Sequence, residues 1–154
     1  MKRKSVIKIH LISTVTAGLT IFSFFTATII SEVVNDTQLI LTVKEKILYA
    51  LPILLISMPS VGISGVKLTG RYKSPLHVTK LKRMKIIAFN GILLILLAIY
   101  LYVNSRDGVF GRLFWAAQTL ELMLGAANLF LIARNIRAGF ILKGRYRERV
   151  IKKQ

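Results

Sequence analysis

The stretch FWAAQTLELMLGAANLFLIA, residues 114–133, is long and apolar enough to cross a lipid bilayer, yet it contains Gln118, Glu121 and Asn128. A helix of about 20 apolar residues spans the ~30 Å hydrocarbon core of a membrane. Three further stretches meet this requirement, at residues 11–31, 47–66 and 86–103. The sequence therefore predicts an all-α protein, a single transmembrane domain folded as an integral membrane four-helix bundle.

The composition combines two properties that rarely occur together in a soluble domain. Of the 154 residues, 54% are hydrophobic, and the net charge is +17. A nucleic-acid-binding protein would account for the charge but not for the hydrophobicity, and no base-stacking or base-reading module accompanies the basic residues. A membrane protein with basic cytoplasmic loops accounts for both. The predicted partner is therefore the lipid bilayer, and no nucleic-acid partner is expected.

The basic residues are distributed unevenly over the segments that flank the predicted spans. Nineteen of the 23 lie before the first span, in the 67–85 connection or in the tail after residue 133. The other four lie in the 32–46 and 104–113 connections. Because strongly basic loops remain in the cytoplasm, both termini are predicted to be cytoplasmic. The protein is accordingly expected in the cytoplasmic (inner) membrane.

Two basic clusters lie on this predicted cytoplasmic side. The first contains Lys80, Lys82, Arg83 and Lys85, before the third span, and the second contains Arg145 and Tyr146, in the tail. Clusters of this kind can contact the acidic headgroups of lipids. The interpretation that we favour is simpler: the charges fix the topology by holding helix ends at an anionic membrane surface.

An internal repeat is visible in two places. SGVKLTGRYKS at residues 64–74 resembles AGFILKGRYRE at 138–148, and TAGLTIF at 16–22 aligns with FNGILLI at 89–95. The repeat suggests two tandem helical hairpins. Since each hairpin would cross the membrane twice, the two copies would be parallel, related by a pseudo-two-fold axis along the membrane normal.

The polar residues of the fourth span have helical spacing. At 100° per residue, Gln118, Glu121, Asn128 and Asn135 fall within about 100° of one another on one side of the helix. A polar side of a membrane helix is expected to face the interior of the bundle. Asn90 lies at the same depth as Asn128 on the antiparallel third span, which predicts a hydrogen bond between the two amides. The predicted polar intramembrane site is therefore Glu121, Gln118, Asn128 and Asn90.

Two hypotheses account for the acid in this site. In the first, Glu121 is structural, and its hydrogen bonds to Gln118 and to hydroxyl groups fix the register of the helices. In the second, Glu121 is functional. Removal from water favours the protonated form of a carboxyl group, so that Glu121 could exchange protons and couple them to the movement of a solute.

The two histidines, His10 and His77, both lie on the predicted cytoplasmic side. Neutral imidazoles bind haem iron, so this pair suggests a haem b site as an alternative. We favour interfacial histidines without a cofactor, because neither lies deep in a span. The chain has no cysteine, which excludes disulfides, thiolate zinc sites and thiol redox chemistry, and no metal site is predicted.

The sequence thus favours a small non-enzymatic membrane protein, an accessory or interaction subunit. So small a bundle buries little surface, which favours a homo-oligomer or a subunit of a membrane complex. The first alternative is a proton-coupled carrier or channel that uses Glu121. A haem-binding electron carrier is the second. An enzyme is least favoured, because no nucleophile–base pair or metal cluster is recognisable.

Overall fold

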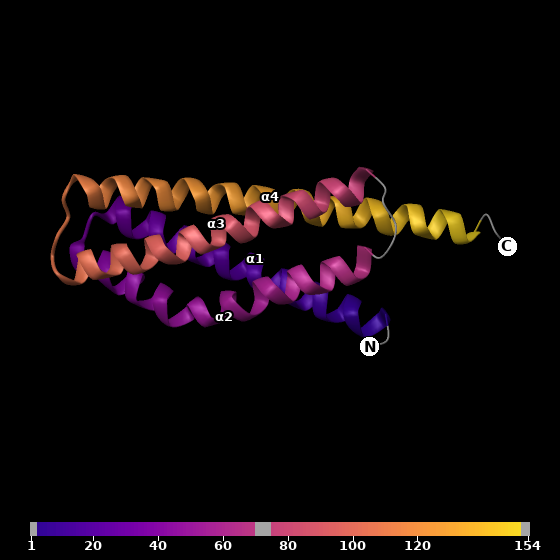
Figure 1. The fold of residues 1–154 in the computed structure, drawn as a ribbon. Helices are drawn as coiled ribbons and strands as arrows, with labels where there is room; N and C mark the ends of the chain where they lie inside the picture. The colour runs from indigo at the N-terminus through magenta and orange to yellow at the C-terminus, as the bar shows by residue number, and fades with distance from the viewer. Residues whose placement is uncertain (1–2, 70–74, 152–154) are drawn as a thin grey trace.

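The computed structural model describes residues 3–69 and 75–151 of the chain, and they form four long helices (Figure 1). The helices are α1 (Arg3–Val34), α2 (Thr37–Thr69), α3 (Pro75–Arg106) and α4 (Arg112–Ile151). No strand occurs in these two ranges. The predicted all-α class is confirmed.

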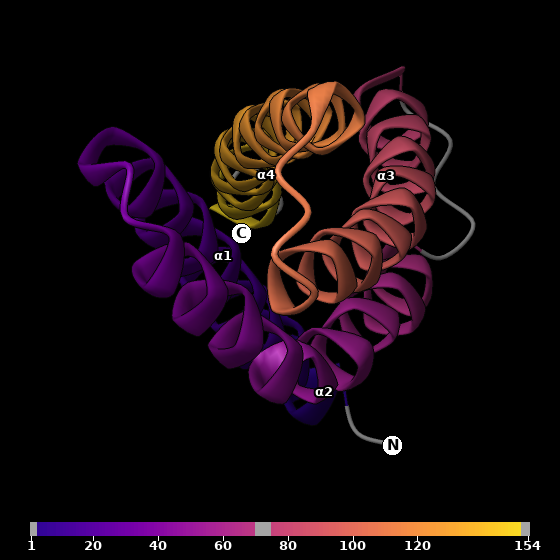
Figure 2. The same ribbon diagram turned by 90° about the vertical axis from the view of Figure 1, so that its left-hand side faces the viewer.

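Each helix packs on two neighbours, in the order α1, α2, α3, α4 and back to α1, so that the helices surround a common interior (Figure 2). The contact between α1 and α4 is the least extensive of the four. The helices that face each other across the bundle do not touch through their backbones: within the described ranges, no Cα atom of α1 approaches α3 within 8 Å, and the same holds for α2 and α4. Only long side chains can bridge these diagonals.

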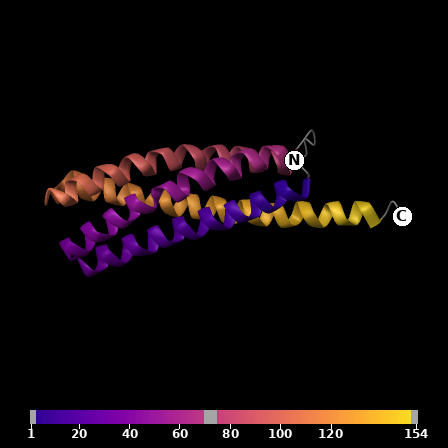
Figure 3. The same cartoon turned by 90° about the horizontal axis from the view of Figure 1, so that it is seen from below.

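The two ends of the bundle differ in charge. One end holds the start of α1, the end of α2, the start of α3 and the later part of α4, and it carries most of the basic residues; we call it the basic end. The other end, the far end, holds the connections 35–36 and 107–111. The α1–α2 hairpin diverges from the α3–α4 hairpin toward the far end (Figures 2 and 3).

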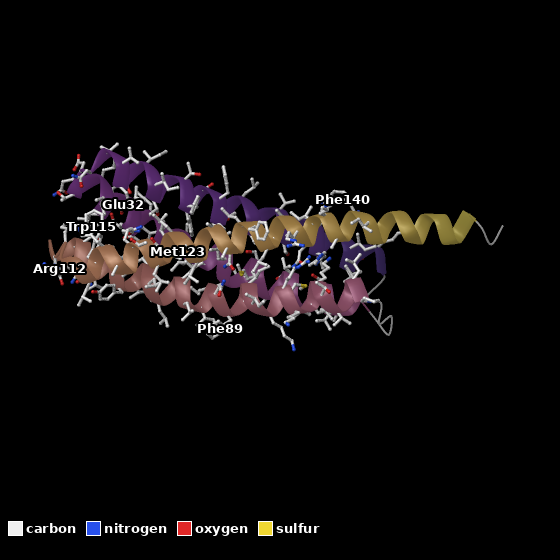
Figure 4. All side chains as sticks on the ribbon, turned by 90° about the horizontal axis from the view of Figure 1, so that it is seen from above. Glu32, Phe89, Arg112, Trp115, Met123 and Phe140 are labelled. Carbon is white, nitrogen blue, oxygen red and sulfur yellow. The ribbon has the colours of Figure 1, made fainter. Side chains whose placement is uncertain are left out.

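All four helices are long and apolar enough to cross a membrane. Large apolar side chains cover their outward faces; Phe89 on α3, for example, points away from the bundle (Figure 4). In water, an apolar surface of this extent would drive aggregation, because soluble monomers rarely expose patches above a few hundred Å². The outward faces are therefore suited to the acyl chains of lipids.

The connection between α1 and α2 is short because its two residues end one helix and begin the next. Asn35 adopts a left-handed conformation (φ 55°), which ends helices, and its N–H donates to the carbonyls of Ser31 and Glu32. The Asp36 carboxylate then accepts hydrogen bonds from the backbone N–H groups of Gln38 and Leu39, as a helix N-cap does. α3 ends in a similar way at Gly108 (φ 70°), and Pro75 opens that helix.

The helices continue well beyond the apolar stretches that identified them. Hydropathy marks the part of a helix suited to the hydrocarbon core, whereas lysine and glutamate also favour helix and extend it past that region. Consequently most of the 32–46 segment, expected to be a connection, is helical and forms the end of α1 and the beginning of α2. Lys44 therefore lies inside α2, not in a loop.

Pro52 and Pro59 lie within α2. The helix continues through both residues and is visibly curved (Figure 1). Proline removes a backbone hydrogen bond and so permits this curvature. The hydroxyl of Ser60 donates to the carbonyl of Ile56, which occupies one acceptor in the proline-containing region.

The tandem-hairpin relationship remains a prediction. Residues 70–74, which include the first Gly-Arg-Tyr segment, lie outside the described residues, as do the side chains of Arg145 and Tyr146 in the second. The four-helix arrangement itself is compatible with two hairpins packed side by side.

Candidate functional site

The polar side of α4 is buried along its whole length. The exposed fraction is 2% for Gln118, 9% for Glu121, 0% for Asn128 and 9% for Asn135. These four residues follow one another along a single face of α4, and that face is turned toward the bundle interior. A buried polar group needs a partner, so the important question is what each of them contacts.

Glu121 forms an ion pair with Lys44. The ammonium Nζ of Lys44 lies 2.6 Å from Glu121 Oε2, and Gln118 Nε2 donates a second hydrogen bond, of 3.2 Å, to the same oxygen. Lys44 is completely buried. It belongs to α2, which faces α4 across the bundle diagonal, so a lysine side chain bridges two helices whose backbones do not touch.

Lys44 is buried because it occupies a position on the interior face of α2. Ile40, Lys44, Ile47 and Leu51 follow one another at intervals of four, three and four residues, the spacing of a single helix face, and all four are buried. The ammonium group on this face is therefore shielded from water. The Glu121 carboxylate takes the place of water as its hydrogen-bond partner.

A second carboxylate lies near this ion pair. Both side-chain oxygens of Glu32, near the end of α1, are buried and make no hydrogen bond to the described residues. Lys44 and Glu121 are both close enough to act on it electrostatically. Figure 4 places Glu32 at the same end of the bundle as Arg112 and Trp115. We refer to Glu32, Lys44 and Glu121, from three different helices, as the charge cluster.

The charge cluster is covered on its far-end side by apolar side chains. Ile40, Leu101 and Phe114 are buried together, and Phe110 and Ala117 pack against them. The rings of Phe110 and Phe114 meet edge to face at 4.9 Å between centroids, a favourable geometry for aromatic pairs. We call these five residues the far-end cluster. Ile40 lies one turn before Lys44 on α2 and Phe114 two turns before Glu121 on α4, so the far-end cluster lies between this ion pair and the far end.

On the other side of the charge cluster lies a large cavity. It has a volume of about 1640 Å³ and is lined by all four helices. At one limit are Lys4 and Lys80, at the basic end, and at the other is Glu121. Between these limits the lining is predominantly aliphatic, with Ile21, Leu51, Leu54, Ile95 and Ile132 among the residues that form it. Several of the lining side chains, among them Leu11, Ile92 and Phe140, are exposed, so the cavity opens to the surface of the bundle between helices.

His10 lies at the basic end of the cavity, and its hydrogen bonding can be assigned. Its Nδ1 is 3.0 Å from the Ser64 hydroxyl oxygen, while the Ser64 hydroxyl itself donates to the carbonyl of Ser60. Because a hydroxyl has one proton, Nδ1 of His10 must be the donor to Ser64. The second ring nitrogen, Nε2, of the neutral ring then has no proton and can act only as an acceptor. The side chain of His77 lies outside the described residues, so the predicted haem b pair stays a prediction.

The predicted hydrogen bond between Asn90 and Asn128 is absent, and this prediction is wrong. Neither amide atom of Asn128 has a hydrogen-bond partner among the described residues, and Asn90 is only half-buried. Equal depth on antiparallel helices does not determine which way each side chain faces, and the two amides do not meet. Asn128 also does not line the cavity, whereas Asn135 does.

The predicted lipid-contacting lysines divide into two kinds. Lys82 and Lys85 are exposed on α3, and Arg83 is half-buried. Lys80, one turn closer to the helix start, instead lines the cavity. Arg145 and Tyr146 cannot be placed in either kind, because their side chains lie outside the described residues.

Comparison with known protein families, with curated proteins and with solved structures finds no match to this chain. Among the described residues, no group of three or more histidine, cysteine, aspartate or glutamate side chains is arranged to hold a metal ion. The features of the described residues that bear on function are therefore the charge cluster and the cavity.

Proposed function

We propose that this chain is an integral membrane protein of the cytoplasmic membrane, with both termini inside, that binds an apolar or amphipathic molecule within its helical bundle. The observation that carries this proposal is the cavity of about 1640 Å³ between the four helices. Small-molecule sites in proteins are mostly apolar and concave, with a few polar groups at defined places, and typically measure 300–1,000 Å³. The bundle interior meets this description and has room to spare.

The cavity favours a ligand-binding role over that of an accessory subunit. A subunit that acted only through its outer surface would gain stability from a filled interior, because packing between small and aliphatic side chains holds membrane helices together. Here glycines line the interior instead, among them Gly62, Gly65, Gly91 and Gly125. An added Cβ atom would have room at Gly62 and Gly91, whereas the Met84 and Phe25 side chains pack closely against Gly65 and Gly125.

The proposal predicts that a residue that fills the cavity blocks binding. Gly91 lines the cavity, and a Cβ atom there would meet only the flexible Met58 side chain, at 3.6 Å from its sulfur. Gly91→Leu is therefore expected to fold and to lower the affinity for an uncharged probe, monopalmitoylglycerol, at least tenfold. Native mass spectrometry of the purified protein in non-ionic detergent measures the bound fraction.

The matched control is Ala133→Leu, which adds similar bulk to an exposed position of α4. It should bind monopalmitoylglycerol as the wild-type chain does. If the wild-type chain takes up no more of the probe than Gly91→Leu does, the cavity is not a binding site for apolar molecules and the proposal fails.

A second candidate function, a proton-coupled carrier, is favoured by the position of Glu32. The charge cluster holds one ammonium group and two carboxylates, and charges in a medium of low dielectric constant are least costly when they sum to zero. One bound proton would achieve this. Lys44 could then pair with either Glu121 or Glu32, depending on which carboxylate is ionised, and Glu121 borders the cavity.

This candidate predicts that ligand binding moves protons. In weakly buffered solution, saturation of the wild-type chain with monopalmitoylglycerol should change the number of bound protons by at most about one per chain, through release or uptake. A ligand that binds two protonation states with different affinities shifts the equilibrium between them. A pH-indicator dye measures the change. Glu32→Gln should abolish it, while Glu45→Gln, a change to a half-buried acid one residue beyond Lys44 on α2, should not. Equal proton exchange in the wild type and in Glu32→Gln would exclude Glu32 as the exchanging group.

A further inference from the structure

Lys80 is placed so that its ammonium group lies inside the bundle. It is half-buried near the start of α3 and lines the cavity. A Cβ atom added to Gly139 on α4 would come within 3.7 Å of Lys80 Nζ, so the ammonium lies against the backbone of the neighbouring helix. The absence of a side chain at Gly139 leaves room for it.

The chain offers Lys80 little negative charge in return. Of the six acidic residues, Glu32, Asp36, Glu45, Asp107 and Glu121 all lie in the half of the bundle toward the far end, and the sixth, Glu148, lies near the end of α4. Within the described part of the chain, the ion pairs are Lys44–Glu121 and Arg106–Asp107. Lys80 belongs to neither. A partly buried cation without an anion is unfavourable, and a bound anion would stabilise it.

Donors from two other helices accompany Lys80 at this end of the cavity. Lys4 contributes a second ammonium group from α1, and Asn135 contributes a buried amide from α4. His10 lines the same end of the cavity, but its Nδ1 donates to Ser64, so Nε2 of the neutral ring has no proton to donate to an anion. Ammonium groups and N–H donors that converge in a partly buried site bind phosphate and carboxylate oxygens through charge-assisted hydrogen bonds.

The rest of the cavity has the opposite character, because aliphatic side chains line it from this polar end to Glu121. We propose that the cavity binds an anionic amphiphile, with its phosphate or carboxylate head at Lys80 and Lys4 and its alkyl chain directed toward Glu121. This inference rests on the proposed ligand-binding function and specifies the class of ligand. The amphiphile would enter with its head at the level of the cytoplasmic headgroups, where the basic end lies in the proposed topology.

The test compares probes that share a palmitoyl chain and differ in the head. Palmitoyl lysophosphatidic acid should bind the wild-type chain about tenfold more tightly than monopalmitoylglycerol, because the charge-assisted contacts add to the contribution of the chain. Palmitate should behave like the lysophosphatidic acid, and inorganic phosphate without a chain should show no saturable binding. Native mass spectrometry in non-ionic detergent gives the affinities.

Substitution of Lys80 should remove the preference for the charged head and leave the binding of the palmitoyl chain unchanged. Lys80→Gln is expected to bind lysophosphatidic acid about tenfold less tightly while its affinity for monopalmitoylglycerol is unchanged, and Lys80→Arg should retain the preference. The matched control is Lys82→Gln, which removes an equal charge from an exposed position on the same helix. It should behave like the wild type.

Four results would overturn the inference. Equal binding of charged and uncharged probes would show that the head is not recognised, although the cavity would still be a binding site for apolar molecules. An equal loss in Lys82→Gln would mean that general surface charge attracts the probe. Saturable binding of inorganic phosphate alone would mean a site for the free anion. If neither palmitoyl probe bound, the ligand-binding function itself would fail, and the inference with it.

Discussion

Replacement of Lys44 with methionine is expected to lower the free energy of unfolding by about 3–5 kcal/mol, the usual cost of removing one partner from a buried ion pair. Methionine nearly matches the length of the lysine side chain and keeps the apolar contacts of its methylene groups. The Glu121 carboxylate, with a side chain that is 11% exposed, would lose its closest partner and would retain only the amide of Gln118. Thermal unfolding in detergent micelles, followed by circular dichroism, measures the loss.

The double variant Lys44→Met/Glu121→Met should recover most of this stability, because removal of both charges leaves neither group without a partner. Lys46→Met, at an exposed position two residues along α2, should change the stability by less than about 0.5 kcal/mol. A double variant as unstable as Lys44→Met would contradict the assignment of the two residues as partners. So would a single Lys44→Met variant as stable as the wild type.

The same comparison tests the structural hypothesis for Glu121. Its close contact with Lys44 is a structural use of the acid, since it joins α2 to α4 across the diagonal of the bundle. Buried charges of this kind can specify one arrangement of helices over others, even where they add little to stability. The proton-exchanging role is better suited to Glu32, which lies nearby and has no hydrogen-bond partner among the described residues.

The helices and the polar side of α4 could be predicted because both are periodic features of the sequence. Length and hydropathy identified four helices, and the spacing of Gln118, Glu121, Asn128 and Asn135 identified one helix face. Their partners could not be predicted in the same way. Depth along a span locates a side chain on one axis only, and the predicted Asn90–Asn128 bond failed because the rotation of each helix about its own axis was unknown.

Lys44 was assigned to a connection because a charged segment, Lys44-Glu45-Lys46, interrupts the hydropathy of the second span. A different signal could have located it. Ile40, Ile47 and Leu51 already define an apolar helix face, and Lys44 falls on it. A lysine on the apolar face of a membrane helix requires an acid on another helix, and Glu121 is the only acid within the predicted spans.

The cavity has no such signal in the sequence. Its volume depends on the separation and divergence of the two hairpins, to which many side chains contribute small amounts. The glycines that line it are scattered over α2, α3 and α4 and have no common motif. Helix packing in membranes usually uses such residues to bring backbones together, so that the sequence by itself favours a closed interior. In the structure Gly65 and Gly125 do pack closely against neighbouring side chains, yet a large space remains between the four helices.

The interior is therefore divided into layers along the bundle axis. The basic end contributes donors, the middle is an apolar cavity, the charge cluster follows, and the far-end cluster covers it. A ligand that entered from the basic end would meet Glu121 at the limit of the cavity. The far-end cluster thus has two expected roles, to keep water from the charge cluster and to hold the two hairpins together where they diverge.

Phe114→Ala tests the second of these roles and should have the other large effect on stability. Phe114 is 1% exposed and packs against Ile40 of α2 and Leu101 of α3, so its ring joins three helices. Its removal should lower the free energy of unfolding by about 3 kcal/mol, near the lower limit for a buried phenylalanine. In a soluble protein part of that cost comes from transfer of the ring out of water, and this part is smaller when the surroundings are lipid.

The matched control is Trp115→Ala. The next residue along α4 is also aromatic, and its ring meets that of Phe114 edge to face at 5.4 Å, but it is 40% exposed and should cost less than about 1 kcal/mol. Both variants can be compared by thermal unfolding in the same detergent. Equal losses would mean that the far-end cluster does not hold the hairpins together, and that the charge cluster alone joins them at this end.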